Sequence, residues 1–217
     1  ISGPVFDTFL LLSNPTGTDA QVTVTYLPDG AASVAVPHIL PANSRLTVLV
    51  SNEAEWADAT GLGMHVHVDN AVPIIAERAM WWPSSATGAW EEGHGSAGSP
   101  VMGTTFATSD GVAGGPQGAS TWILVANPSN TTATARVTLS FEDGTAPVST
   151  TVTIGPLARV SLDAASTFPI ADGKRFSATV ESTGGTPTPI IVEQSIYWSF
   201  GTDHWVTGVN MPASRIQ

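Results

Sequence analysis

Cysteine is absent from this chain of 217 residues, and lysine occurs only once, at Lys174. Without cysteine there is neither a disulfide framework nor a thiolate metal site, and the redox compartment is not indicated. Acidic residues outnumber basic ones by 18 to 7, so the formal net charge is −11 and the phosphates of a nucleic acid would be repelled. No apolar run approaches the roughly 20 residues of a membrane-spanning helix. We therefore expect no nucleic acid partner and no membrane insertion.

Charge is sparse and turn-forming residues are abundant: charged residues make up 12% of the chain, with 21 glycines and 16 prolines. Many Thr, Ser, Ala and Val residues accompany them, and this composition favours strands joined by tight turns. The length suits two domains of about 100 residues. The opening ISGPVFD resembles neither a signal peptide nor an amphipathic anchor, and we expect the chain to be part of a longer precursor.

The chain repeats itself at an offset of 113 to 116 residues. TFLLLSNP at 8–15 matches TWILVANP at 121–128, and PIIAERAMWW at 73–82 matches PIIVEQSIYW at 189–198. Between these two matches along the chain, NSRLTV at 43–48 matches LARVSL at 157–162. A tandem duplication is the simplest explanation. We expect one domain over residues 1–102 and a second over 103–217, joined near residues 99 to 104.

Each copy has the pattern of an antiparallel all-β domain. QVTVTYL at 21–27 alternates apolar and polar residues before the turn Pro28-Asp29-Gly30, as a half-buried strand does. Six or seven short strands per copy predict two tandem Ig-like β-sandwiches. In the first copy we expect strands at 8–13, 21–27, 32–37, 44–50, 62–69 and 72–82. Residues 52–60 and their counterpart AASTFPIADG are expected to be loops.

Both copies place a glutamate within an apolar run, Glu77 in the first and Glu193 in the second. A carboxylate among apolar neighbours requires a partner. Arg45 and Arg159 occur at matching positions, so we expect Arg45 to pair with Glu77 and Arg159 with Glu193 as clamps between strands. The alternative is that both carboxylates lie in water at a sheet edge.

Taken together, TFLLLSNP, VTVTYLPDG, PANSRLTVLV, PIIAERAMWW and GHGSAG resemble a family of repeated domains in large exported proteins of actinobacteria, chloroflexi and acidobacteria. Units of that family read TYLLLANP…ANSR…PIIAERAMYW…GGHSSIG. The resemblance covers nearly the whole chain and implies a secreted or surface-attached β-sandwich module of unknown function. It transfers no catalytic residues. Two departures are Gln194 in place of arginine and HWVTGVNMPAS in place of the glycine-histidine segment.

Units of the family usually open with an additional strand. TTFATSDG at 104–111 has this place in the second copy, and the first copy has no counterpart. The first copy is therefore expected to lack an edge strand, and neighbouring repeats or copies of the same protein are expected to pair with the free edge. The alternative is an edge that is short or covered by another part of the chain.

Three groups of residues suggest chemistry. In WEEGHGSAG, His94 stands where a nucleophile elbow needs glycine, so we expect a glycine-rich loop and no catalytic residue. His65, His67 and Asp69 share one strand face, but a histidine pair without a firm third ligand is weak evidence for metal, and a solvated face is the alternative. We expect no cofactor.

Tryptophan, with seven residues, outnumbers tyrosine, with two. Exposed tryptophans commonly stack on sugar rings, so the candidate ligand-binding residues are Trp81, Trp82, Trp90, Trp198, Trp205 and His94. Core packing is the alternative, and it is the interpretation favoured for Trp90 and Trp205. Strand periodicity places Trp81 and Trp82 on opposite faces, which exposes one of them or places it at the domain interface.

We therefore expect a non-enzymatic, extracellular structural, adhesion or assembly module of a bacterial surface or secreted protein. The alternative is a carbohydrate-binding module that uses exposed tryptophans, with glycans as partners.

Overall fold

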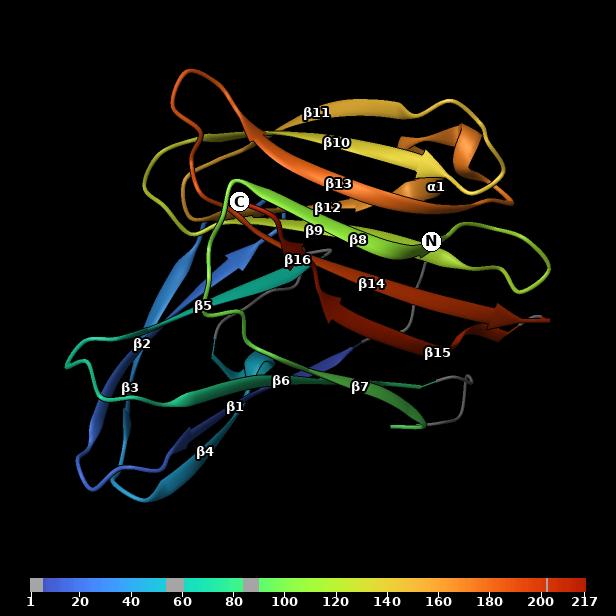
Figure 1. The fold of residues 1–217 in the computed structure, drawn as a ribbon. Coiled ribbons are helices and arrows are strands. Elements are labelled where there is room, and N and C mark those ends of the chain that lie inside the picture. Colours follow the sequence, from blue (N-terminus) through green and yellow to red (C-terminus); the bar gives the residue numbers. More distant parts are fainter. Residues whose placement is uncertain (1–5, 54–60, 84–89, 202) are drawn as a thin grey trace.

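The computed structural model describes residues 6–53, 61–83, 90–201 and 203–217, and the chain folds as an all-β protein of antiparallel sheets (Figure 1). The first half contains β1 (Asp7–Asn14), β2 (Ala20–Pro28), β3 (Val34–Leu40), β4 (Ser44–Leu49), β5 (Leu62–Val68), β6 (Ile75–Trp82) and β7 (Glu92–Ala97). The second half contains β8 (Thr105–Val112), β9 (Ser120–Asn127), β10 (Ala133–Phe141), β11 (Val148–Ile154), β12 (Ala158–Asp163), β13 (Arg175–Thr183), β14 (Ile191–Phe200), β15 (Asp203–Pro212) and β16 (Ser214–Arg215).

Within the described residues the strands form four sheets. Sheet A has the order β4-β1-β6-β7 and sheet B the order β3-β2-β5. Sheet C has the order β12-β9-β14-β15 and sheet D the order β11-β10-β13-β8-β16. Within the described ranges, no sheet combines strands from 1–102 with strands from 103–217. Whether each half folds on its own stays a prediction.

Strand alternation builds a separate core in each half. In β2, Val22, Val24 and Tyr26 are buried while the residues between them are not, and they join Leu10 and Leu12 of sheet A in one cluster. In β10, Val137 and Leu139 likewise join residues from sheet C. The sheets of each half therefore pack face to face.

The same buried asparagine closes the equivalent corner of each half. Asn14 Nδ2 donates to the carbonyls of Thr18, Leu40 and Pro41 at 2.8, 3.2 and 3.1 Å. Asn127 Nδ2 donates to the carbonyls of Thr131, Ile154 and Gly155 at 2.7, 3.3 and 2.8 Å. This network explains the NP signature of both copies, because each side chain satisfies backbone groups where two sheets meet.

Two segments expected to be loops have regular structure. The glycine-rich segment around His94 forms β7, which pairs with β6 from Glu92 opposite Trp82 to Ala97 opposite Glu77. AASTFPIADG contains a helical turn, α1 (Ala164–Thr167), followed by the 3-10 turn η2 (Pro169–Ala171), and Asp163 caps α1 by accepting from Ser166 N at 2.7 Å. In the first half, η1 spans Val50–Asn52. Residues 54–60 lie outside the described ranges.

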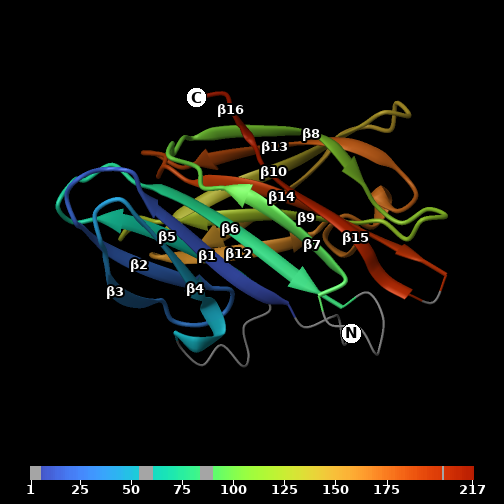
Figure 2. The ribbon, with the colours of Figure 1, turned by 90° about the horizontal axis from the view of Figure 1, so that it is seen from below.

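The halves differ beside one pair of equivalent strands. In sheet D, β8 pairs with β13 and buries Phe106, which is 2% exposed. In sheet B, β5 is the last strand among the described residues. Among the described residues no strand pairs with the second edge of β5, and this open side of the first half faces the second half in Figure 1. Figure 2 views the molecule from the side on which β1, β6 and β7 of sheet A lie in front.

Candidate functional site at the junction of the two halves

Aromatic side chains from both halves form one cluster at the junction. Trp82, at the end of β6, is fully buried and donates from Nε1 to the Trp205 carbonyl at 2.7 Å. Its ring lies 5.6 Å from the ring of Tyr197, which stacks on Trp205 at 4.5 Å. Phe6 lies between them, with ring centroids 5.2 Å from Trp82 and 5.7 Å from Trp205. Burial of several aromatic rings fixes the two halves against each other.

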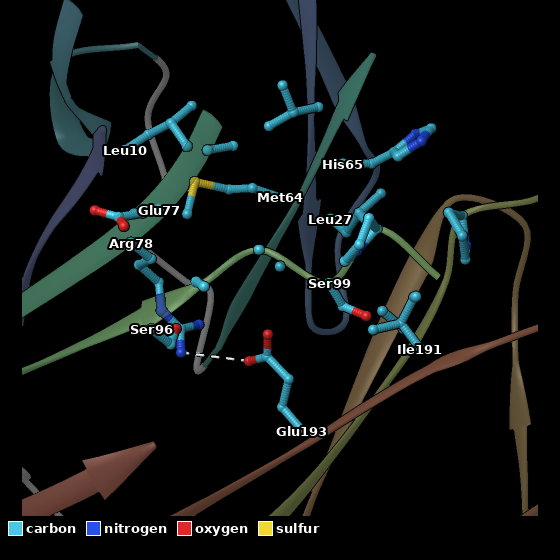
Figure 3. A pocket seen from close by; sticks show the side chains of 18 of the residues that line it. Leu10, Leu27, Met64, His65, Glu77, Arg78, Ser96, Ser99, Ile191 and Glu193 are labelled. Carbon is cyan, nitrogen blue, oxygen red and sulfur yellow. Dashed lines mark hydrogen bonds and ion pairs between the residues drawn. The ribbon is translucent and has the colours of Figure 1, made fainter. Parts of the chain in front are cut away.

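An ion pair also crosses the junction. Arg78 Nη2 lies 3.3 Å from Glu193 Oε2, with side chains that are 11% and 22% exposed (Figure 3). Asn210 Nδ2 lies 3.5 Å from the same carboxylate oxygen. A pair so largely removed from water is costly to break, because the remaining charge loses its partner.

Neither of the ion pairs expected from the repeat is found among the salt bridges of the described residues. Glu193 pairs with Arg78 of the other half instead of Arg159. Arg45 and Glu77 are both exposed on the outer face of sheet A, where β1 separates their strands. The expectation was wrong because Glu193 is paired across the junction and Glu77 is exposed to solvent, and a repeat pattern contains no information about contacts between copies.

Arg159 binds the first half at the open edge. It donates from Nη1 to the carbonyl of Leu62 at the start of β5, and Gly61 and Gly63 leave the space that its side chain occupies. Burial, followed by the nearby Arg78, lowers the pKa of Arg159 to about 10. Nearby, Ser161 N donates to Asp29 Oδ2 at 2.8 Å, so the turn after β2 is also held by β12.

His94 is a junction residue. Its ring packs edge-on against Trp82 at 5.4 Å, and its Nε2 lies 3.3 Å from the Tyr197 hydroxyl. Burial, with a further contribution from Arg78, lowers the pKa of His94 to about 4. A histidine held neutral between aromatic rings suits packing.

A cavity of about 570 Å³ lies where the open side of the first half meets sheet C (Figure 3). Its lining is mostly apolar, with Leu10, Leu27 and Met64 from the first half and Leu124 and Ile191 from the second. Arg78 and Glu193 close one side. The space lies beside β5, where β8 would stand if the first half were built like the second.

Trp81 and Trp90 lie outside the junction, on the outer face of sheet A. They are 41% and 56% exposed, so the expectation that Trp90 packs in a core is wrong. Their rings lie 6.4 Å apart, and Phe9 meets Trp90 edge-on at 5.6 Å. A side-chain carbon added to Gly93 would lie 2.6 Å from the Trp81 ring, so this glycine lets the indole lie on the sheet.

The remaining candidate residues are not gathered in one site. Trp198 is half-buried and lines a smaller hollow with Gln117 and Phe200. His65 and His67 have ring centroids 6.5 Å apart, and His67 Nε2 lies 3.8 Å from Asp69 Oδ1. Over the described part of the chain, no group of three or more metal-binding side chains is found, and no helix has the length and apolar character needed to cross a membrane.

Three contacts of the junction were not predicted from the sequence: those of Arg78 with Glu193, of Arg159 with the Leu62 carbonyl, and of Tyr197 with the aromatic cluster. The replacement of Arg78 by Gln194 in the second copy was a usable signal. Gln194 is buried within its own half, where its Nε2 donates to the Asp110 carbonyl of β8. Arg78 thus contacts the other half, whereas its equivalent Gln194 bonds within its own half.

The fold and the junction define an all-β protein of four antiparallel sheets in two halves. No protein-family model matches the chain, and a search of curated proteins found no match. The chain is similar to the crystal structure of Thermotoga maritima 1070, at 22% identity and a TM-score of 0.44 over 52% of this chain and 94% of that chain. It is also similar to the Anabaena sensory rhodopsin transducer, at 18% identity and a TM-score of 0.35 over 42% and 94%. Likenesses this distant carry no argument about function.

Proposed function

We propose that this chain is a non-enzymatic structural module for assembly, built from two Ig-like sandwiches and belonging to a bacterial surface or secreted protein. The observation that carries the proposal is the junction itself. A buried tryptophan, a largely buried ion pair and a stacked tyrosine hold one unit on the next. A rigid joint of this kind suits a protein that transmits position or force along a series of units.

The resemblance to repeated units of exported proteins adds to this proposal, because such proteins need protease-resistant links between their parts. The acidic charge and the lack of cysteine are compatible with that environment. At the junction Arg78 pairs with Glu193 and His94 packs against aromatic rings, and this use of titratable groups suits a structural role.

Calorimetry together with small-angle scattering tests the proposed rigid joint. We expect the two halves to unfold in one transition and the scattering to match one rigid shape. Trp82→Ala should split the transition and loosen the shape, whereas Trp198→Ala, which removes the equivalent residue of the second half, should leave the shape intact. Independent tumbling of the halves in the unmodified chain would disprove a rigid joint. Surface biotinylation of intact cells that make the parent protein tests the location.

A second function is favoured by a specific observation, the exposed rings of Trp81 and Trp90 on sheet A, with the half-buried ring of Phe9 beside Trp90. Flat exposed rings of this kind suit the apolar faces of sugars. A polysaccharide pull-down tests this alternative, since carbohydrate binding should be lost in Trp81→Ala and kept in Trp198→Ala. If the unmodified chain bound no polysaccharide, the carbohydrate-binding alternative would be disproved and only the structural function would remain.

A further inference from the structure

The outer faces of sheets A and C are built alike, residue by residue. Arg45 lies opposite Ser13 as Arg159 lies opposite Ala126. Across the next strand pair, Glu77 lies opposite Leu11 as Glu193 lies opposite Leu124. The register is therefore the same in both sheets, and equivalent side chains have the same positions on the two faces.

The aromatic residues of the two faces also match. On sheet C, Trp122 meets Trp205 edge-on at 6.5 Å, as Phe9 meets Trp90 on sheet A at 5.6 Å. Tyr197 lies beside Trp205 as Trp81 lies beside Trp90. The matching extends to the glycine beneath the ring, because a side-chain carbon added to Gly208 would lie 2.5 Å from Tyr197, as one added to Gly93 would clash with Trp81.

One of these two equivalent faces is covered and the other is not. On sheet C, Arg78 pairs with Glu193, and Trp82 and His94 pack on Tyr197, which is only 6% exposed. On sheet A the corresponding residues face solvent, with Ile75 53% exposed, Trp81 41% and Trp90 56%. Exposed apolar groups rimmed by charges in this way commonly mark an interaction surface.

We propose that the outer face of sheet A is a docking face for another unit of the first-half type. This docking face consists of Phe9, Arg45, Ile75, Glu77, Trp81 and Trp90. The incoming unit places an arginine on Glu77 as Arg78 lies on Glu193, and a buried tryptophan over Trp81 as Trp82 lies over Tyr197. Arg45 reaches the start of its free edge strand, as Arg159 reaches Leu62. The inference deepens the proposed function and rests on it.

The partner is of the first-half type because the second half lacks the groups that dock. Gln194 replaces Arg78 and bonds to its own β8, and Val209 replaces His94. The second half is closed by β8, whereas the first half presents an open side that a neighbouring sheet covers. Units of the first-half type can therefore follow one another, and a unit of the second-half type ends the series. The contact is heterologous, so each unit uses two different surfaces.

Chemical cross-linking in a cysteine-free chain tests the docking face. A second copy of residues 1–97 is fused ahead of the full chain through a Gly/Ser linker as long as residues 98–119, which lead from β7 to β9. The native junction is probed by Asp29→Cys with Ser161→Cys, which lie in contact. The new junction is probed by Asp29→Cys in the added copy with Thr47→Cys in the following copy, since Thr47 lies opposite Leu11 as Ser161 lies opposite Leu124. A short bis-maleimide joins each pair.

We expect both pairs to cross-link with similar yield. Glu77→Arg in the following copy should abolish the new cross-link and leave the native one intact, whereas Glu142→Arg, at an exposed position directly after β10 of sheet D, should change neither. A native cross-link without the new one would overturn the docking face and leave the proposed function standing. Loss of both would overturn the proposed function as well. Polysaccharide that binds the full chain through Trp81 and is not displaced in the fusion would also overturn the docking face.

Discussion

The two halves complete the same sheet in different ways. In the second half β8 pairs with β13 and fills the core with Phe106, so this half is closed by its own chain. In the first half no strand of the described ranges pairs with the second edge of β5, and the outer face of sheet C covers that side instead, over a cavity of about 570 Å³. One copy of a duplicated unit can thus lack a strand that the other copy has, and a neighbouring unit covers the exposed side instead. The stability of the copy that lacks the strand then depends on the neighbouring unit.

The largest effect is expected from removing the ring that β8 contributes. Phe106→Ala should lower the free energy of unfolding by about 4 kcal/mol, because a buried phenylalanine leaves a cavity that the surrounding strands fill poorly. Urea unfolding measures the change. Phe200→Ala is the matched control, since this ring is 75% exposed, and it should change stability by less than about 0.5 kcal/mol. If the two variants behaved alike, β8 would not be what closes the second half.

The buried asparagines at the equivalent corners should contribute equally to the stability of the two halves. Asn14→Ala and Asn127→Ala each remove a side-chain amide that donates to three carbonyls, and we expect each to cost about 3 kcal/mol. Asn130→Ala, at an exposed position, serves as the control. Unfolding curves of the three variants make the comparison. A large difference between the first two would show that the two corners are not equivalent in energy.

Much of the fold could be predicted from the sequence, and the junction could not. Strand alternation and turn residues are local signals, so the expected strands at 8–13 and 21–27 correspond to β1 and β2. The prediction for the segment around His94 was wrong because its glycines suggest a loop. In the structure, a glycine of this segment lies on a strand and makes room for the ring of Trp81. Glu193 was assigned the wrong partner because Arg78 belongs to the other half. Contacts between copies depend on how whole sheets pack, which neither alternation nor the repeat offset determines.

The equivalent glutamates should separate the covered face from the uncovered one. Glu193→Gln should cost about 2 kcal/mol, less than for a fully buried pair, because Arg78 loses its charged partner at a junction that water partly reaches. Glu77→Gln, at the same register position on the exposed face, should change stability by less than about 0.5 kcal/mol. Urea unfolding of both variants at pH 7 provides the test. Equal losses would mean that the covered and uncovered faces do not differ in the way the structure indicates.

The smallest effect is a pH dependence that arises from His94, which the first half contributes to the junction. The folded chain lowers the pKa of His94 from 6.5 to about 4, so the neutral ring is the form that the junction binds. The stabilisation is complete above pH 6.5 and is lost as the pH falls towards 4, because the unfolded chain takes up the proton first. After reduction for solvent screening the loss is on the order of 1 kcal/mol. His94→Gln should remove this pH-dependent part of the stability. The free energies of unfolding of the variant and of the unmodified chain should therefore differ by one amount at pH 7 and by another at pH 4.5. The second half has Val209 at this position, so the stability difference between Val209→Gln and the unmodified chain should be the same at pH 7 and pH 4.5. If the stability difference between His94→Gln and the unmodified chain were also the same at both pH values, His94 would not titrate at the junction.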